Sequence, residues 1–293
     1  MQKLSLSLSK FYACSMKVTL IISTYDAPRY LECVLKSLLV QTRMPEEILI
    51  ADDGSGQETR AVIDQYRLLF SSPVEHLWQE NKGFRKSRIL NWAFATAKGD
   101  YILVLDGDLI VDKHYIADQL RFARPGYFSY ASRMMLPEKI TQLLLSSRAA
   151  IVPYRVRCGT INAILLPFIT PLYLSLTAKK IQRKTLRGGI MAAWRSDLIA
   201  VNGYDEAFEG WGYEDTDLGI RLQNSGLKMQ HLKFCAVSYH MDHGGSNRIK
   251  SKQEAKNKTL AQKSHQKRLI RCENGLDKWL KKSILMSLNL ASD

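Results

Sequence analysis

The sequence lacks the features that identify disulfide-rich, zinc-ribbon or membrane-spanning proteins. Its five cysteines are odd in number and form no CxxC pair, which favours reduced thiols over disulfides or structural zinc. No apolar run reaches the length of about 18 residues that a spanning helix needs. The first 17 residues contain no apolar block typical of a signal peptide, and Met16 is an alternative start. We therefore expect a cytoplasmic protein without a spanning helix.

Acidic residues are nearly absent from two segments of the chain. Residues 133–187 hold ten basic side chains and one acidic one, and residues 248–282 hold twelve and three. The rest of the chain is neutral to acidic, although the formal net charge is +14. Because the positive charge is confined to two blocks, we expect it to attract an anionic membrane surface. A nucleic-acid-binding protein is the alternative, but neither block contains a recognisable nucleic-acid-binding module, so we expect no nucleic acid partner.

The first 125 residues alternate between patterns typical of strands and of helices. Apolar, β-branched runs predict strands at 17–23, 47–51, 74–78 and 101–105. Apolar residues at helical spacing predict helices at 28–39, 57–70 and 84–97. This alternation with short links predicts an α/β fold, a Rossmann-like and mostly parallel sheet with helices on both faces. Ligands bind such sheets at the carboxyl ends of the strands.

The rest of the chain divides into three further segments. Residues 126–187 form a basic and apolar insertion, which either contacts a membrane interface or covers the active-site cleft. Two prolines in its 16-residue apolar run argue against one straight helix. Residues 188–247 predict a compact part with a helix near 215–225 and an apolar strand near 229–239. Residues 248–293 predict a basic helical tail.

Carboxylates follow two of the predicted strands. Asp106 and Asp108 come directly after a fully apolar strand, where two acids repel each other unless a cation lies between them. A hard divalent ion that also binds a diphosphate explains this pair, and a plain Asp-Gly turn is the alternative. Asp52 and Asp53 end another strand, where one can cap the next helix and the other can accept hydrogen bonds from a base or a ribose.

Three further strings contain residues suited to chemistry. Residues 81–88, NKGFRKSR, place cations at a helix N-terminus, where the helix dipole disfavours them unless an anion binds there. Residues 210–217, GWGYEDTD, place a tryptophan between glycines and three acids behind it, one of which could serve as a general base. His240 and His243 have a spacing that can supply a metal ligand.

Taken together, these strings resemble the inverting glycosyltransferases of family 2, whose nucleotide-sugar-binding fold is called GT-A. The motif order STYD, ADDGS, NKGFRKSR and LDGD carries the resemblance over residues 17–125. The string that runs from GGIMAAW to GWGYEDTDLGIRL at 188–222 resembles the acceptor half of galactosyltransferase-type enzymes and of chondroitin-type polymerases. The resemblance implies a nucleotide-sugar-binding half at 17–125 and an acceptor-binding and catalytic half at 188–247.

The resemblance also implies roles for individual residues. The residues that match donor-binding positions are Ser23, Tyr25, Asp53, Arg85, Arg88 and Asp106. The residues that match ligands of Mn²⁺ or Mg²⁺ are Asp106, Asp108 and one of the histidines, His240 or His243. Asp215 matches the catalytic base, and the residues that match acceptor-binding positions are Trp211, Gly212 and Glu214.

These roles imply a metal-dependent, inverting transfer. We expect a hexose or an N-acetylhexosamine to pass from a UDP sugar to a sugar hydroxyl of a cell-surface glycan, such as lipopolysaccharide core, O-antigen or capsule. A lipid-linked acceptor would place the enzyme as a peripheral protein on the inner face of the plasma membrane. One alternative is transfer to a polyprenyl phosphate, which does not need the GWGYED half. A Rossmann dehydrogenase is disfavoured because no G-x-G-x-x-G follows the first strand.

Overall fold

The computed structural model describes residues 16–146, 166–181, 186, 188–243 and 252–282. The expectations for the N-terminal segment, for part of the 126–187 segment and for the last residues of the tail fall outside this range. The described cysteines are free and buried, in agreement with the reduced state that we expect, and they are Cys33, Cys235 and Cys272. In the described part of the chain, no helix has both the length and the apolar character needed to cross a membrane.

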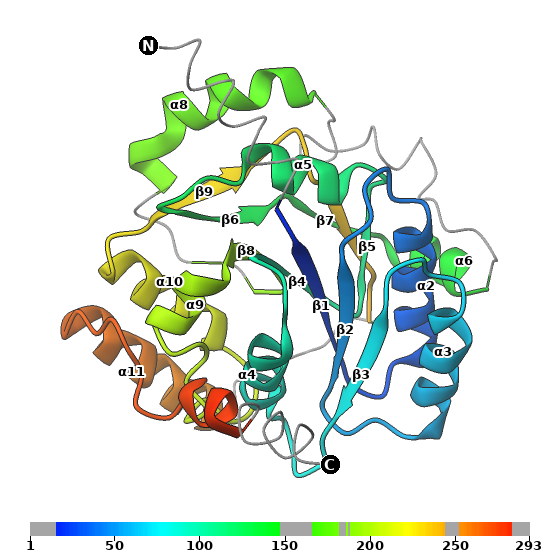
Figure 1. Cartoon of the computed structure of the whole chain (residues 1–293), viewed down its shortest axis with the longest axis horizontal. Helices are drawn as coiled ribbons and strands as arrows, with labels where there is room; N and C mark the ends of the chain where they lie inside the picture. Colours follow the sequence, from blue (N-terminus) through cyan, green and yellow to red (C-terminus); the bar gives the residue numbers. More distant parts are fainter. Residues whose placement is uncertain (1–15, 147–165, 182–185, 187, 244–251, 283–293) are drawn as a thin grey trace, which may run out of the picture.

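A seven-stranded sheet forms the centre of the molecule, with strand order β3-β2-β1-β4-β8-β6-β9 (Figure 1). Its strands in chain order are β1 (Val18–Thr24), β2 (Glu47–Asp52), β3 (Val74–Trp78), β4 (Tyr101–Asp106), β6 (Tyr127–Ala131), β8 (Ile190–Trp194) and β9 (Lys228–Leu232). The first four are parallel, as the sequence predicts. Strand β8 runs antiparallel to its neighbours β4 and β6, while β6 and β9 are parallel to each other.

Both faces of this sheet are buried, because alternate residues of each strand enter two different apolar cores. In β1, Leu20 and Ile22 belong to one core and Ile21 to the other. The helices that line the first core are α2 (Pro28–Leu39), α3 (Gln57–Arg67), α5 (Tyr115–Phe122) and α6 (Glu138–Ser146). Those of the second core are α4 (Lys86–Thr96), α9 (Arg195–Ala200) and α10 (Glu214–Asn224). Helices therefore cover both faces, as predicted.

A second, three-stranded sheet corrects one prediction. Its strands are β5 (Leu109–Val111), β7 (Arg133–Met135) and β10 (Ser238–His240), in the order β5-β10-β7. The single strand predicted near 229–239 is wrong, because β9 pairs in the large sheet and β10 in the small one. The chain changes direction between them at Phe234 and Ala236, whose φ values are positive. The residues at the break, 234–237, are themselves apolar, so the pattern does not mark where one strand ends and the next begins.

The segment 126–187 contributes to the fold in two ways. Its first strand, β6, lies inside the large sheet, so this part of the expected insertion belongs to the central architecture. Further along, a short 3₁₀ helix (Pro167–Ile169) leads into α8 (Thr170–Ile181), which packs against the edge strand β9. The prolines at 167 and 171 lie at the beginnings of these two helices, where proline is tolerated.

The basic tail packs against α10 and against α4. Helix α11 (Lys252–Gln266) lies along α10. Beyond it, Leu276 and Trp279 are buried in the second core, and the Trp279 ring stacks on Trp92 with a centroid distance of 5.6 Å. The described part of the tail is therefore integral to the fold, although its composition resembles that of a solvated segment.

Candidate active site

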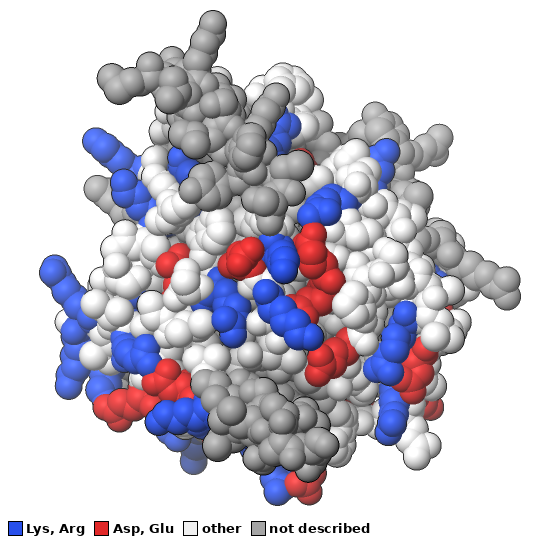
Figure 2. Space-filling model, in the orientation of Figure 1, with Lys and Arg blue, Asp and Glu red and all other residues white. Residues whose placement is uncertain are grey.

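A cavity of about 860 Å³ opens at the carboxyl ends of β1, β2 and β4, where the sequence predicts the ligand site. The start of α10 and the residues around the end of β10 complete its wall. Acidic and basic side chains gather near the middle of the face shown in Figure 2. The predicted site residues that line the cavity are Ser23, Tyr25, Asp53, Asp106, Asp108, Trp211, Gly212, Glu214, Asp215, His240 and His243.

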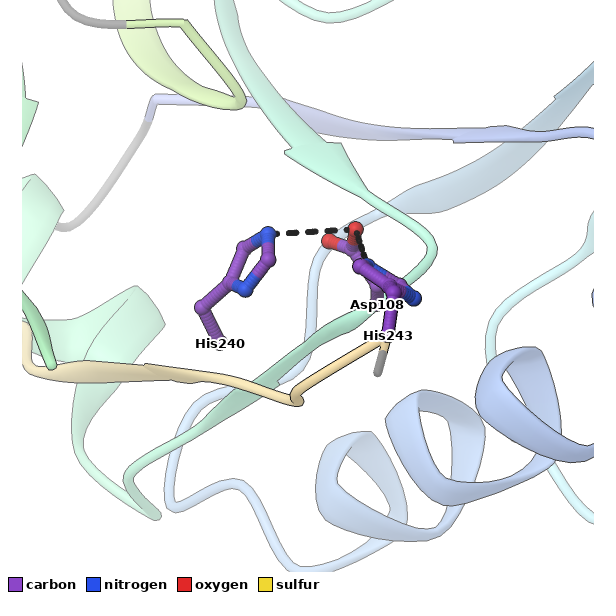
Figure 3. Close-up of side chains that lie close together, drawn as sticks. All are labelled: Asp108, His240 and His243. Atoms are coloured by element: carbon purple, nitrogen blue, oxygen red, sulfur yellow. Dashed lines mark hydrogen bonds and ion pairs between the residues drawn. The ribbon is translucent and has the colours of Figure 1, made fainter. Parts of the chain in front are cut away.

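One end of the cavity is a cluster of a carboxylate and two imidazoles (Figure 3). The Oδ2 atom of Asp108 is 2.8 Å from Nε2 of His243 and 3.3 Å from Nε2 of His240. The small sheet assembles this cluster, because β10 pairs with β5 and places His240 opposite Leu109, next to Asp108. Burial alone would raise the pKa of Asp108, but hydrogen bonds from the two histidines and their positive charge hold that pKa well below its usual range.

The cluster fits a divalent metal ion. One ligand atom from each of Asp108, His240 and His243 lies within 4.8 Å of the others, a spacing that a single ion can bridge. The Oδ1 atom of Asp108 and the Nδ1 atom of His240 are buried and have no hydrogen-bond partner in the part of the chain that the structure describes. Carboxylate with imidazole suits Mn²⁺ better than Mg²⁺, which prefers oxygen ligands.

Asp106, which the sequence predicts to share the metal, lies outside this cluster. Its Oδ1 atom accepts hydrogen bonds from Ser23 Oγ at 2.7 Å and from Lys86 Nζ at 2.6 Å. The Lys86 ammonium is also 4.0 Å from Oδ2 of Asp215, so it joins the donor side of the cavity to the acceptor side. Burial would lower the pKa of Lys86, but the surrounding carboxylates raise it far above its ordinary value, so Lys86 is charged.

The other end of the cavity is the first turn of α10, where Asp215 is held by a buried tyrosine. The hydroxyl of Tyr204 donates a hydrogen bond of 2.7 Å to Oδ1 of Asp215. Glu214, one residue earlier, is only 6% exposed, and its Oε2 atom has no hydrogen-bond partner among the described residues. Burial, with the charge of Asp215 beside it, raises the pKa of Glu214 to about 7. Asp215 thus has a hydrogen-bond partner for one of its oxygens, whereas Oε2 of Glu214 has none among the described residues.

Two glycines that precede β8 let the backbone pass between the acids. A Cβ atom at Gly188 would lie 2.3 Å from Oδ2 of Asp215, and one at Gly189 would lie 2.4 Å from Oδ2 of Asp106. Gly189 also has a φ of +87°, which side-chain-bearing residues rarely adopt. A larger residue at either position would therefore displace one of the two carboxylates.

Aromatic rings border the open part of the cavity. Tyr25 and Trp211 are 49% and 47% exposed, as rings that stack on a ligand need to be. The loop that carries Trp211 is fixed from the tail, because Nδ2 of Asn257 donates hydrogen bonds to the carbonyls of Glu209 and Gly212, both at 3.0 Å. The tail thus positions the predicted acceptor loop.

The two aspartates after β2 divide their roles. Asp52 is fully buried and holds the turn, since Oδ1 accepts hydrogen bonds from the backbone N–H groups of Gly54 and Ser55 and Oδ2 contacts His76. Asp53 lines the cavity, and its carboxylate accepts hydrogen bonds from the side chain of Gln79 and from a backbone N–H. Of the two, Asp53 is therefore the one that can reach a bound ligand.

The basic string at 81–88 places one cation in the cavity wall, and it is Lys86. The side chain of Arg85 donates to the carbonyl of Glu80, and Arg88 lies over the ring of Trp279, 5.3 Å from its centroid. Neither arginine that the resemblance matches to the donor region lines the cavity. Four residues that position the site are not named individually in the sequence analysis: Lys86, which it includes only in the basic string at 81–88, and Gly188, Gly189 and Tyr204. A basic helix start and a GG pair are visible signals for three of them, whereas nothing in the sequence links Tyr204 to Asp215.

Comparison with known proteins gives two family matches along this chain. A family described as "Glycosyl transferase family 2" matches residues 19–176, which is more than half of the chain. A family described as "N-terminal domain of galactosyltransferase" matches residues 172–244. The two matches follow each other in the order that the sequence motifs predict.

Two curated relatives give matches over most of the chain. The chain is 20% identical over 269 residues to a chondroitin synthase from Escherichia coli, a match that covers 83% of this chain and 37% of that protein. It is 28% identical over 226 residues to the O-antigen biosynthesis protein RfbC from Myxococcus xanthus, covering 73% and 16%. The chain thus spans less than half the length of either relative.

The fold is shared with a solved structure of GalNAc-T7 with UDP, GalNAc and Mn²⁺. The TM-score is 0.62 at 15% sequence identity, over 85% of this chain and 48% of that one. At this identity the likeness concerns the fold alone. It confirms the GT-A fold that the motif order implies.

Proposed function

Because the chain belongs to glycosyl transferase family 2, we propose that it transfers a hexose or an N-acetylhexosamine from a UDP sugar to a sugar hydroxyl of a cell-surface glycan. Lipopolysaccharide core, O-antigen and capsule are the acceptors that we consider. The observation that carries the proposal is that the Asp108 cluster and the Asp215 carboxylate line one cavity. Relatives named for chondroitin and O-antigen synthesis support the acceptor class.

The donor would bind at the end of the cavity that contains Asp53, Asp106 and Asp108. An Mn²⁺ or Mg²⁺ ion held by Asp108, His240 and His243 would neutralise the nucleoside diphosphate as it leaves. Lys86 is a cation beside Asp106, from which it can contact the same phosphates. The solved relative with UDP and Mn²⁺ supports both the nucleotide and the metal.

The acceptor would bind over the ring of Trp211, near the first turn of α10. Asp215 would take the proton from the attacking hydroxyl, with Tyr204 holding its other oxygen in place. The buried Oε2 atom of Glu214 lacks a partner among the described residues, and an acceptor hydroxyl would supply one. Attack on the face opposite the leaving diphosphate is a single displacement, which inverts the anomeric centre.

A panel of nucleotide sugars tests the donor class directly. Thermal melting is measured with UDP, GDP and CMP sugars, each with Mn²⁺, with Mg²⁺ and with EDTA. A ligand at about 100 times its Kd stabilises the native state by about 2.7 kcal/mol, which shifts the melting temperature by several degrees. We expect a shift with a UDP sugar and Mn²⁺ that EDTA removes. No shift with any nucleotide sugar would contradict the proposal.

A further inference from the structure

Helix α8 packs against the molecule along one side. The hydroxyl of Thr170 donates a hydrogen bond of 2.8 Å to the carbonyl of Lys233, and the hydroxyl of Tyr173 pairs with Nδ1 of His231 at 2.9 Å. Thr170 and Ile181, at the two ends of the helix, are buried. The helix lies at the margin of the molecule, beside the edge strand β9 (Figure 1). Leu174 packs against the first apolar core and Ile181 lies in the second, so the inward side combines hydroxyl and apolar contacts.

The outward side of this helix is apolar. Phe168, Leu172 and Leu176 are 71%, 62% and 77% exposed, and their spacing of four places them on one face over successive turns. We call these three residues the α8 stripe. A surface helix of a soluble protein normally has polar residues on its outward side, whereas this helix has apolar residues on both sides. A row of exposed large apolar side chains indicates an interaction surface.

Positive charge borders the α8 stripe, and acidic side chains are absent from it. Lys179 and Lys180 are exposed in the last turn of α8, and Lys179 continues the outward face. Lys233 lies beside the N-terminal half of the helix, 5.8 Å from the centroid of the Tyr173 ring. Helix α8 itself contains no Asp or Glu. An apolar row flanked by lysines matches the boundary between acyl chains and acidic headgroups.

We propose that the α8 stripe docks this protein on an anionic phospholipid bilayer, with the stripe in the acyl boundary and the flanking lysines at the headgroups. A helix of 12 residues is too short to cross a bilayer, so it would lie in the interface. A second copy of the chain is a poorer partner, because its own lysine-rich surface would meet these lysines. In the function proposed above, docking would set the cavity near a lipid-linked acceptor at the inner face of the plasma membrane.

Vesicle co-sedimentation of the full chain tests this docking. Vesicles of phosphatidylcholine with 30% phosphatidylglycerol are compared with vesicles of phosphatidylcholine alone. The stripe variant is Leu172→Ser with Leu176→Ser, and the matched control is Leu68→Ser with Leu69→Ser, two leucines after α3 that are 85% and 56% exposed. All four side chains are at the surface, so neither variant removes core packing.

We expect the wild-type chain and the control to bind the anionic vesicles, and the stripe variant to bind at least about tenfold more weakly, since a buried leucine contributes roughly that much. Charge reversal at Lys179 and Lys180 is expected to weaken binding to anionic vesicles only. Equal binding by the stripe variant, or no binding by the wild-type chain, would overturn the proposal. The proposal would also be overturned if the wild-type chain were a dimer and the stripe variant a monomer. The melting shift caused by a nucleotide sugar is measured in a separate experiment. Failure of the proposed glycosyltransferase function is therefore distinguished from failure of membrane docking.

Discussion

The two ends of the cavity hold their carboxylates in opposite ways. At the donor end, Asp108 lies between two histidines, and its pKa is held well below the usual range. At the acceptor end, Glu214 is buried beside Asp215, and its pKa is raised to about 7. A carboxylate that stays ionised between two imidazoles can bind a cation once those imidazoles are neutral, whereas a buried pair of acids can accept and share a proton. The predictions below separate these two roles, from the largest expected effect to the smallest.

Replacement of Asp215 by Asn should have the largest effect on transfer. The amide cannot take a proton from the acceptor hydroxyl, so we expect the transfer rate to fall by roughly 10³- to 10⁴-fold. The donor end is untouched, so the melting shift caused by a UDP sugar with Mn²⁺ should remain. Kinetic assays and melting curves on the same preparation measure the transfer rate and the melting shift. Transfer near the wild-type rate would remove Asp215 from its role as the base.

Replacement of Asp108 by Ala should break the donor end alone. Loss of this ligand removes several kcal/mol of charge stabilisation, so we expect a roughly 10³-fold slower transfer and no melting shift with Mn²⁺. Asp64→Ala is the matched control, because Asp64 is a half-exposed acid on α3 outside the cavity. Metal titration followed by melting measures the difference. A variant that still responds to Mn²⁺ would place the metal elsewhere.

Glu214→Gln should change how stability depends on pH. The pKa of Glu214 is raised from 4.5 to about 7 in the folded state, so the folded chain retains a proton that the unfolded chain loses. Wild-type stability should therefore fall as the pH rises from about 4.5 to about 7, by up to about 3 kcal/mol. The variant should lack this loss and melt higher than wild type at pH 8, with no difference at pH 4. Parallel melting curves without metal check this, and equal curves at pH 8 would contradict it.

Tyr204→Phe should have the smallest effect of the four. The hydroxyl hydrogen bond to Asp215 is lost while the ring stays packed, so we expect kcat to fall roughly tenfold with an unchanged KM for the donor. Tyr115→Phe serves as the control, since Tyr115 is equally buried but lies in the other apolar core. A change in KM rather than kcat would indicate that Tyr204 shapes the donor end instead.

The local pattern of the sequence predicts the parallel half of the sheet well. The strands at 18–24, 47–52, 74–78 and 101–106 lie within one residue of the predicted runs. Three of them are buried on both faces and are therefore nearly continuous apolar segments, whereas the edge strand at 74–78 is only partly buried. The apolar residues between β9 and β10 hide the break there. A buried apolar run gives no sign of which sheet each half joins, and that choice depends on distant partners.

In the candidate site, too, some residues can be predicted from the local sequence and others only from contacts between distant parts of the chain. Asp106, Asp108 and Asp215 stand out in the sequence because charged residues next to apolar strands or at helix starts need a reason. The contact between Tyr204 and Asp215 cannot be found in this way, because a buried tyrosine looks like any core residue until its partner is known. Lys86 is similar, since its basic neighbours at 85 and 88 fit the motif equally well and only the packing separates them.

Asn257, whose hydrogen bonds fix the loop around Trp211, follows the strands of both sheets in the chain. A nascent chain of 250 residues already contains every strand of both sheets and the residues of the metal cluster. It lacks the one amide that fixes the carbonyls of Glu209 and Gly212. Because domains form from the N-terminus as the ribosome advances, the donor end can be assembled while the loop around Trp211 is still unsupported. The loop that we propose to bind the acceptor is therefore completed after the large sheet.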